Sequence, residues 1–373
     1  MKNLLKISIL TAMGGTLFAS QATFAATTNA PGKFRPPTET QQLAGAVNFA
    51  TAKSALPIVT DLPVTAFDNN IQSNVPAKVF SEAGHKPVVK ANFKAQQLFN
   101  PALFPQTSKQ LATVAPQAFG GGGIQFTGSR ITPEATGTSY PLSATGKLWF
   151  TLNGIWYMCS GSMVKPGVVV TAGHCVHSGN GAASGWAANF QFAPAYRNGK
   201  APYNVWTNWQ WVNTTSTWYW GGGNVPNAAD YGVIVFDKNA SGYRIGDYTG
   251  WLGWQYPAMV GQHVTALGYP GNIDAGNINQ RMDSNVDQGP NNTGVFGSYM
   301  EGGSSGGGIV FNLGENGNGA PTGSWEFNRN RLVSVISYGY TSPANYMVQG
   351  GSQFDDRFEN LLDAACSKVP SAC

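Results

Sequence analysis

Short apolar runs separated by glycine, asparagine and proline turns dominate the chain from residue 146 onward. The runs are rich in β-branched and aromatic side chains, which is typical of strands. They cover residues 147–152, 155–158, 167–171, 231–236, 263–267, 307–311 and 332–336. This pattern predicts an all-β fold, and about 230 residues of β structure suit two packed barrels better than one.

One segment, at the C-terminus, has the periodicity of a helix. Ser352 is a candidate N-cap, and Asp355 stands three residues later. The apolar residues that would share one helical face are Phe354, Phe358, Leu361, Leu362 and Ala365. We therefore expect a C-terminal α-helix after the barrels.

The first 25 residues have the pattern of an export signal. Lys2 and Lys6 precede a mostly apolar stretch over residues 7–18, and small residues flank a cleavage position after Ala25. A membrane anchor would need about 20 continuous apolar residues, and this stretch is shorter. We expect a secreted protein with a cleaved signal peptide and without membrane insertion.

Residues 26–125 differ in composition from the rest of the chain. They contain ten of the 22 prolines but no tryptophan or cysteine, and they end in a run of glycines. Because the material for a large core starts only near Leu148, we expect a largely irregular prosegment here. The alternative is a disordered or adhesive extension that stays attached. The folded domain is expected over 126–373, with barrels over roughly 140–245 and 246–350.

The distribution of charge excludes one class of partner. The formal net charge is +4, yet residues 1–129 hold 10 of the 22 Lys and Arg and only 4 of the 18 Asp and Glu. The excess positive charge therefore belongs to the leader. Because a nucleic acid requires a clustered basic face on the folded domain, we expect no such partner.

Four cysteines in an exported chain predict two disulfides. Of the three possible connectivities, the pairing Cys159–Cys175 with Cys366–Cys373 gives each bond a short loop. The first bond would clamp the strand that delivers His174, and closing a loop of about 15 residues contributes roughly 3 kcal/mol.

Zinc bound by Cys159, His174, Cys175 and His177 is the alternative use of these side chains. Adjacent His174 and Cys175 are awkward co-ligands, and an oxidising compartment favours the disulfide. We therefore expect no metal.

Three side chains predict nucleophilic catalysis by a serine hydroxyl. His174 follows an apolar run, Asp230 opens another, and Ser305 lies in the glycine-rich segment 303–307. A serine nucleophile needs an imidazole to accept its proton and a buried carboxylate to orient that imidazole. Because the order His, Asp, Ser is one of three known chain orders, we expect His174 as general base, Asp230 as its orienter and Ser305 as nucleophile.

Rival residues fit these roles less well. His85 lies in the leader, His177 lies in a polar stretch, and His263 begins a strand without a cysteine clamp. Asp237 and Asp247 do not open an apolar strand. An α/β-hydrolase requires a histidine after its serine, which this chain lacks, and the subtilisin order requires an aspartate before the histidine, where only the leader offers one.

The glycines around Ser305 predict an oxyanion site. Gly303 allows the backbone to turn so that the N–H groups of Gly303 and Ser305 point at one oxyanion. Taken alone, this segment also fits a flexible Gly/Ser loop.

Together these segments resemble the chymotrypsin-like serine endopeptidases, and most closely the exported bacterial branch that includes the glutamyl endopeptidases. The resemblance covers residues 125–366, and its matching segments are 159–162, 171–175, 230–236, 268–271, 302–306 and 337–339. It implies two six-stranded antiparallel barrels with the active site between them, protein or peptide substrates, and no metal or organic cofactor. It also implies that Ser337, Tyr338 and Gly339 pair with the substrate backbone and that Tyr299 lies in the specificity pocket.

Departures from the family pattern limit what the resemblance implies. Digestive members carry an aspartate that receives the freed N-terminal amine, where this chain has Ser304. The mature N-terminus is expected near Ile124 or Ile131, without an activation switch of that kind. Tyr299 offers no carboxylate to a basic side chain, and the strand ending near Ser337 lacks the histidine of glutamyl members. Cleavage after an apolar or medium side chain is therefore expected.

The sequence thus predicts a secreted serine endopeptidase, made as a proenzyme and monomeric, with its own prosegment as a partner before maturation. The alternative is a catalytically weak or inactive binding or adhesion protein on a peptidase scaffold. Its contact surface would be the tryptophan-rich stretch 206–220, although such aromatics usually pack in a core. Covalent labelling of Ser305 separates the two.

Overall fold

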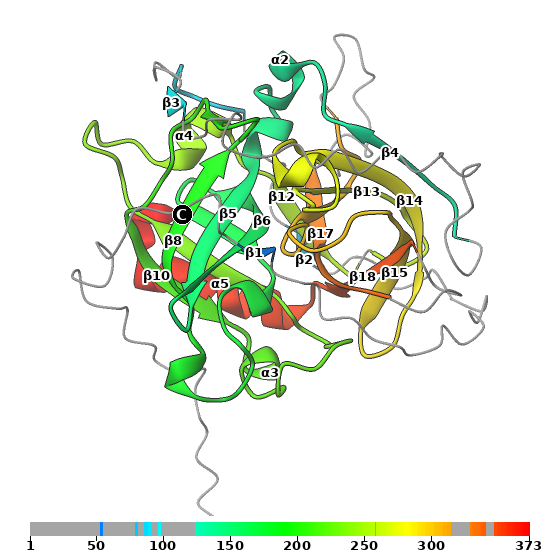
Figure 1. Ribbon diagram of the computed structural model, residues 1–373. Helices are drawn as coiled ribbons and strands as arrows, with labels where there is room; N and C mark the ends of the chain where they lie inside the picture. Colours follow the sequence, from blue (N-terminus) through cyan, green and yellow to red (C-terminus); the bar gives the residue numbers. More distant parts are fainter. Residues whose placement is uncertain are drawn as a thin grey trace, which may run out of the picture.

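The computed structural model describes residues 53–54, 79–80, 86–90, 96–97, 124–257, 259–314, 329–340 and 347–373. The expected signal peptide over residues 1–25 lies outside the described residues, and so does most of the expected prosegment. Figure 1 shows the described part as two β-barrels side by side, the first mostly green and the second yellow to red.

The first barrel is an open antiparallel sheet in the strand order β10-β11-β7-β6-β5-β8. Its strands are β5 (Thr145–Leu152), β6 (Ile155–Lys165), β7 (Val168–Thr171), β8 (Ala188–Pro194), β10 (Trp209–Thr214) and β11 (Gly232–Phe236). The valines of β7 and β11 are fully buried, as a strand covered on both faces requires. The tryptophan-rich stretch is mainly part of the core, because four of its tryptophans are buried: Trp206, Trp209, Trp211 and Trp218. Trp220, at the end of the stretch, is 62% exposed.

The second barrel is closed. Its strands are β13 (His263–Gly268), β14 (Gln280–Gln288), β15 (Thr293–Gly297), β16 (Gly308–Phe311), β17 (Arg331–Gly339) and β18 (Val348–Gln353). β16 pairs with both β13 and β17, which completes the ring. Two further strands extend this sheet: β4 (Phe126–Arg130) pairs with β14, and β12 (Gly253–Tyr256) pairs with β17. The expected all-β architecture of two barrels is confirmed.

The hydrophobic pattern of the sequence did not predict three strands of the second barrel: β14, β15 and β18. Buried and more exposed positions alternate along β14, but the buried positions include the polar residue Ser284. The sequence of this strand therefore lacks a continuous apolar alternation. In β18, Gly350 lies against Tyr338 of β17, and a Cβ added there would collide with the Tyr338 ring. These strands depend on their neighbours for stability, because pairing and face packing outweigh intrinsic strand preference.

The C-terminal helix α5 spans Asp356–Lys368. Its N-cap is Asp355, whose side chain accepts a hydrogen bond from the N–H of Arg357. The expectation that Ser352 caps the helix is wrong, because Ser352 is the fifth residue of β18 and is fully buried. The helix packs its apolar face on β10 and β11, and the Cys366–Cys373 disulfide ties its last turn to the C-terminus. Within the described ranges, no helix is long and apolar enough to cross a membrane.

The described pieces of the leader form short strands that pair with strands of the folded domain, two of them in the barrel sheets and one in a separate two-stranded sheet. β1 (Lys53–Ser54) runs parallel to β6, β2 (Val79–Phe80) pairs with β12, and β3 (Gln96–Gln97) pairs with β9 (Lys200–Ala201). The leader therefore contacts the folded domain at several separate places.

Candidate active site

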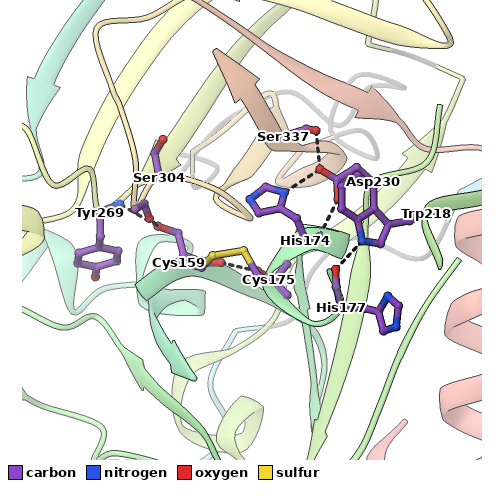
Figure 2. Close-up of a disulfide and its surroundings, with 12 residues drawn as sticks. Cys159, His174, Cys175, His177, Trp218, Asp230, Tyr269, Ser304 and Ser337 are labelled. Atoms are coloured by element: carbon purple, nitrogen blue, oxygen red, sulfur yellow. Dashed lines mark hydrogen bonds and ion pairs between the residues drawn. A yellow bond between two sulfur atoms is a disulfide. The ribbon is translucent and has the colours of Figure 1, made fainter. Parts of the chain in front are cut away.

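His174 lies directly after β7, in a short 3-10 helix (Gly173–Cys175). The Cys159–Cys175 disulfide joins β6 to this turn, with both sulfurs fully buried. A Cβ added to Gly173 would lie 2.8 Å from Asp230 Oδ1, so a larger residue would displace the carboxylate. The disulfide and the glycine together fix where the imidazole emerges (Figure 2).

Asp230 is fully buried and accepts three hydrogen bonds. His174 Nδ1 lies 2.8 Å from Oδ2, the backbone N–H of His174 donates to Oδ1 at 2.8 Å, and Ser337 Oγ donates to Oδ2 at 2.6 Å. Figure 2 shows His174 and Ser337 both pointing to this carboxylate. Because a buried carboxylate draws the proton to Nδ1, Nε2 keeps the lone pair that a general base needs.

A second serine supports the backbone of Asp230. Ser352 Oγ accepts the Asp230 N–H at 3.0 Å and donates to Asn227 O at 2.7 Å. Sequence reasoning assigned Ser352 to a helix cap and Ser337 only to substrate pairing. Their hydrogen bonds to Asp230 span more than one hundred residues, so no local sequence signal could have revealed them.

The Ser305 segment of the second barrel packs directly on the first barrel. The Ser160 N–H donates to Ser305 O at 2.7 Å, and Ser160 Oγ donates to Gly303 O at 2.9 Å. At Gly306, where φ is +77°, an added Cβ would lie 2.7 Å from the Ala172 nitrogen, two residues before His174. The fold thus brings Ser305 and His174 to the same junction between the barrels.

His174 Nε2 and Ser305 Oγ, which both lie at this junction, are among the twelve buried side-chain polar atoms for which the described part of the chain shows no hydrogen-bond partner. Buried polar groups normally find a partner, so each orphan requires an explanation. His174 Nε2 and Ser305 Oγ are the two atoms between which the expected proton transfer would occur.

The backbone near Ser305 leaves two N–H groups without an acceptor among the described residues. The Gly271 N–H donates to Gly302 O at 2.7 Å. Because the peptide unit is planar and trans, the N–H of Gly303 points away from that bond. Neither this N–H nor that of Ser305 donates to another described residue. Gly303 adopts φ +97°, which glycine tolerates without strain.

The residues expected to contact substrate are mostly covered. Tyr338 is fully buried, and its hydroxyl lies 2.9 Å from Thr293 Oγ1. Burial raises the pKa of Tyr338 well above its ordinary value. The half-buried Tyr299 directs its ring toward β4, with 5.7 Å between its ring centroid and that of Phe126. Gly339, at the end of β17, is partly exposed.

His177, the rival base, is committed to its own loop. Its Nδ1 accepts the Gly179 N–H at 2.9 Å, which leaves Nε2 to donate to Ala182 O at 3.0 Å. The Tyr219 ring stacks on it at 4.4 Å, and burial lowers its pKa. With both nitrogens bonded, His177 is a structural residue.

The cysteines and His174 do not fit a metal site. Among the described residues, one group of potential ligands, Cys159, His174 and Cys175, has its ligand atoms within 4.8 Å of one another. Both sulfurs are joined in the disulfide, so no thiolate is left to bind zinc.

Comparison with known proteins adds independent information. Residues 159–316 match the trypsin-like peptidase domain family. The solved structure of the protease Anisep from Arthrobacter nicotinovorans is 30% identical with a TM-score of 0.51, and the match covers 62% of this chain and 98% of Anisep. An extracellular metalloprotease of Bacillus subtilis is 27% identical over 242 residues, 61% of this chain and 68% of that protein. A glutamyl endopeptidase of Bacillus licheniformis is 32% identical over 146 residues, 37% of this chain and 40% of that protein.

The family match includes the disulfide, His174, Asp230 and Ser305, and the match to Anisep spans almost that whole protease. The metal in the name of the Bacillus subtilis relative describes that protein, and the donor set here does not fit one. Peptide bonds are the substrates of the family. This chain therefore belongs to the trypsin-like serine peptidases and is a serine endopeptidase.

Proposed function

We propose that the protein is secreted, is made as a proenzyme, and cleaves peptide bonds through an acyl-enzyme intermediate on Ser305. The observation that carries the proposal is the pair of buried orphan atoms, His174 Nε2 and Ser305 Oγ, with His174 Nδ1 held by the buried carboxylate of Asp230. Substrate binding would bring these two atoms into hydrogen-bond contact, because catalytic hydrogen bonds often tighten only in the substrate complex.

The reaction follows from these positions. Ser305 Oγ attacks the carbonyl carbon of the scissile bond while its proton passes to His174 Nε2. The carbonyl oxygen becomes an oxyanion, which the N–H groups of Gly303 and Ser305 stabilise. The oxyanion then re-forms the carbonyl while the C–N bond breaks and the amine takes the proton from Nε2, which leaves an ester on Ser305. Water attacks this ester and gives its proton to Nε2, and the bond to Ser305 Oγ breaks as Oγ takes that proton back. Asp230 stays ionised and stabilises the imidazolium.

The substrate backbone would pair with the edge of β17 at Ser337, Tyr338 and Gly339. Tyr299 as a wall of the specificity pocket stays a prediction, as does the preference for an apolar or medium side chain. Profiling a peptide library tests both, with cleavage after Leu, Phe or Tyr expected. Cleavage confined to Arg, Lys or Glu would contradict them.

Three observations support a secreted proenzyme. The leader strand β1 pairs with Tyr157 and Met158 of β6, directly before Cys159. An added Cβ at Gly303 would lie 3.5 Å from Met158 Cε, so β1 lies close to the oxyanion segment. Ser305 is fully buried in the uncut chain, although a substrate must reach its hydroxyl. The curated relative named extracellular supports export.

Maturation before Ile124 is favoured over cleavage before Ile131. Arg130 pairs with Gln280 in the sheet, and the Ile131 N–H donates to Asn279 O at 2.9 Å. A protease needs an accessible, extended bond, and both sides of the Arg130–Ile131 bond are tied down. A mass spectrum of the secreted product fixes the mature N-terminus.

A fluorophosphonate probe tests the proposal. It should label the processed protein, and Ser305→Ala should abolish the label while the exposed control Ser129→Ala retains it. His174→Ala should slow labelling strongly, because the hydroxyl loses its base. Absence of labelling in correctly processed protein would instead support the binding or adhesion protein.

A further inference from the structure

The segment from Ser298 to Ser304 sets the position of the nucleophile and of the oxyanion N–H groups. On its solvent side, the exposed Asn272 donates to Tyr299 O at 2.8 Å and accepts the Glu301 N–H at 3.1 Å. These bonds can be replaced by water. The inner side of the segment has a different support.

Gln349, in β18, lies behind this segment and is only 1% exposed. Its Nε2 donates to Ser304 Oγ at 3.1 Å, and its Oε1 accepts from Ser298 Oγ at 2.8 Å. One amide therefore links the first residue of the segment to the residue directly before Ser305. Among the hydrogen bonds of the described residues, Gln349 is the one side chain bonded to both Ser298 and Ser304.

The direction of each bond in this network is fixed by its neighbours. Ser304 Oγ gives its single proton to Glu301 O at 2.7 Å, so it can only accept from Gln349. Ser298 Oγ accepts the Met300 N–H at 3.1 Å and is free to donate to Gln349. The hydroxyls of Ser298 and Ser304 thus both have hydrogen-bond partners, and neither these side chains nor Gln349 carries a charge.

We propose that Gln349 is the positioning residue that holds the segment 298–304 so that the Gly303 and Ser305 N–H groups face the oxyanion. The inference rests on the proposed catalytic role of Ser305 and extends it to a residue that does not touch the substrate. Because the network is neutral and is already formed in the uncut chain, it needs no newly freed N-terminal amine. A charged partner here would also act on the developing oxyanion, which a neutral amide avoids.

The variant Gln349→Met tests the proposal, because it keeps the side-chain volume and removes both hydrogen bonds. We expect kcat of the processed enzyme to fall about 10- to 100-fold while KM stays within about 3-fold, since oxyanion contacts act in the transition state. Affinity for a peptide boronic acid, which mimics the tetrahedral state, should fall by the same factor. Affinity for the cleaved product peptide should not change.

Gln255→Met is the matched control. Gln255 is a buried glutamine of β12 that accepts from Arg331 Nη1 at 3.3 Å, so its loss also removes a buried amide hydrogen bond. It should lower the thermal midpoint without changing kcat. If Gln349→Met does not fold, Ser298→Ala removes one of the same bonds and should lower kcat in the same direction, by about 3- to 10-fold.

Separate results would overturn this inference and the proposed function. Unchanged kcat in Gln349→Met or Ser298→Ala, in an enzyme that Ser305→Ala inactivates, would overturn the role of Gln349 alone. Equal losses of affinity for the boronic acid and for the product peptide would also overturn it, because they indicate general damage. Failure of the wild-type protein to react at Ser305 would overturn the proposed function itself.

Discussion

The two barrels hold their halves of the site by different means. The first barrel fixes His174 with the buried Cys159–Cys175 disulfide and the buried charge of Asp230. The second barrel fixes the Ser305 segment with close backbone contacts at glycines and with neutral hydrogen bonds. An imidazole must keep one tautomer, which a carboxylate enforces. An oxyanion site must present backbone N–H groups, which a neighbouring negative charge would oppose.

The largest expected effect is the loss of kcat when the charge of Asp230, in the half of the site that holds His174, is removed. Asp230→Asn should lower kcat about 10⁴-fold with a similar thermal midpoint, because an amide presents a donor where His174 Nδ1–H needs an acceptor. Steady-state kinetics on a peptide substrate measure this. The control Asp237→Asn, at a half-exposed carboxylate 4.0 Å from Arg244, should leave kcat unchanged. A loss below 10-fold in Asp230→Asn would mean that charge does not orient the base.

The second largest effect is expected at Gly306, in the uncharged half of the site around Ser305. A Cβ at Gly306 would lie 2.5 Å from Ser160 O and 2.7 Å from the Ala172 nitrogen, and φ is +77°. Gly306→Ala should therefore cost about 3–5 kcal/mol of unfolding free energy and most activity. Gly154→Ala is the control, since φ is +76° there but nothing lies within 4 Å, and about 1 kcal/mol is expected. Equal losses in denaturant titrations would show that conformation, not the barrel contact, dominates.

Removal of the covalent clamp should have a smaller effect. The double variant Cys159→Ala and Cys175→Ala should lose about 3 kcal/mol of unfolding free energy and should also lose activity, because the turn carrying His174 is released. The control removes Cys366 and Cys373, which close a shorter loop with a sequence separation of 7 instead of 16. It should cost less and leave kcat intact. An active enzyme without the first disulfide would mean that Asp230 alone positions the base.

The smallest effect concerns Lys147, which joins the two barrels. Its buried Nζ donates to Gly276 O at 2.6 Å and lies 5.2 Å from the Trp149 ring. Burial lowers the pKa of Lys147 to about 7. The unfolded chain thus binds one more proton above that pH, so the unfolding free energy should rise by about 2 kcal/mol from about pH 7 to 9.

Lys147→Met should lack this rise. Its unfolding free energy, measured by denaturant titration across the same pH range, should therefore depend less on pH than that of the wild type. The same slope in both proteins would place the titration on another group.

Local sequence patterns predicted most of the half of the site that lies in the first barrel. A histidine after an apolar strand, a cysteine beside it and an aspartate opening another strand are short-range signals, and the structure brings His174 and Asp230 together. The disulfide pairing followed from loop lengths, and the structure contains both bonds. The catalytic roles of His174, Asp230 and Ser305 stay predictions until the labelling and kinetic experiments are done.

Residues that act through distant contacts carried no local signal. Ser352 was assigned to a helix cap because its spacing from Asp355 fits one, yet pairing with β15 and β17 places it in a strand beneath Asp230. Gln349 and Lys147 look like ordinary surface residues in the sequence. Their roles depend on their burial, which only the complete fold determines.

The amino-acid sequence by itself determined the class of fold, the cysteine pairing and the identity of the candidate base, orienter and nucleophile. Each depends on residue types, on their spacing or on their order along the chain, and none requires knowledge of a tertiary contact. The tertiary structure decided which serines and which amide support those residues, and which glycines must stay bare. The hydrogen bonds of Gln349 span 45 and 51 residues, and those of the two serines to Asp230 span 107 and 122 residues. Over such separations the sequence shows that a polar side chain is present but not which group it faces.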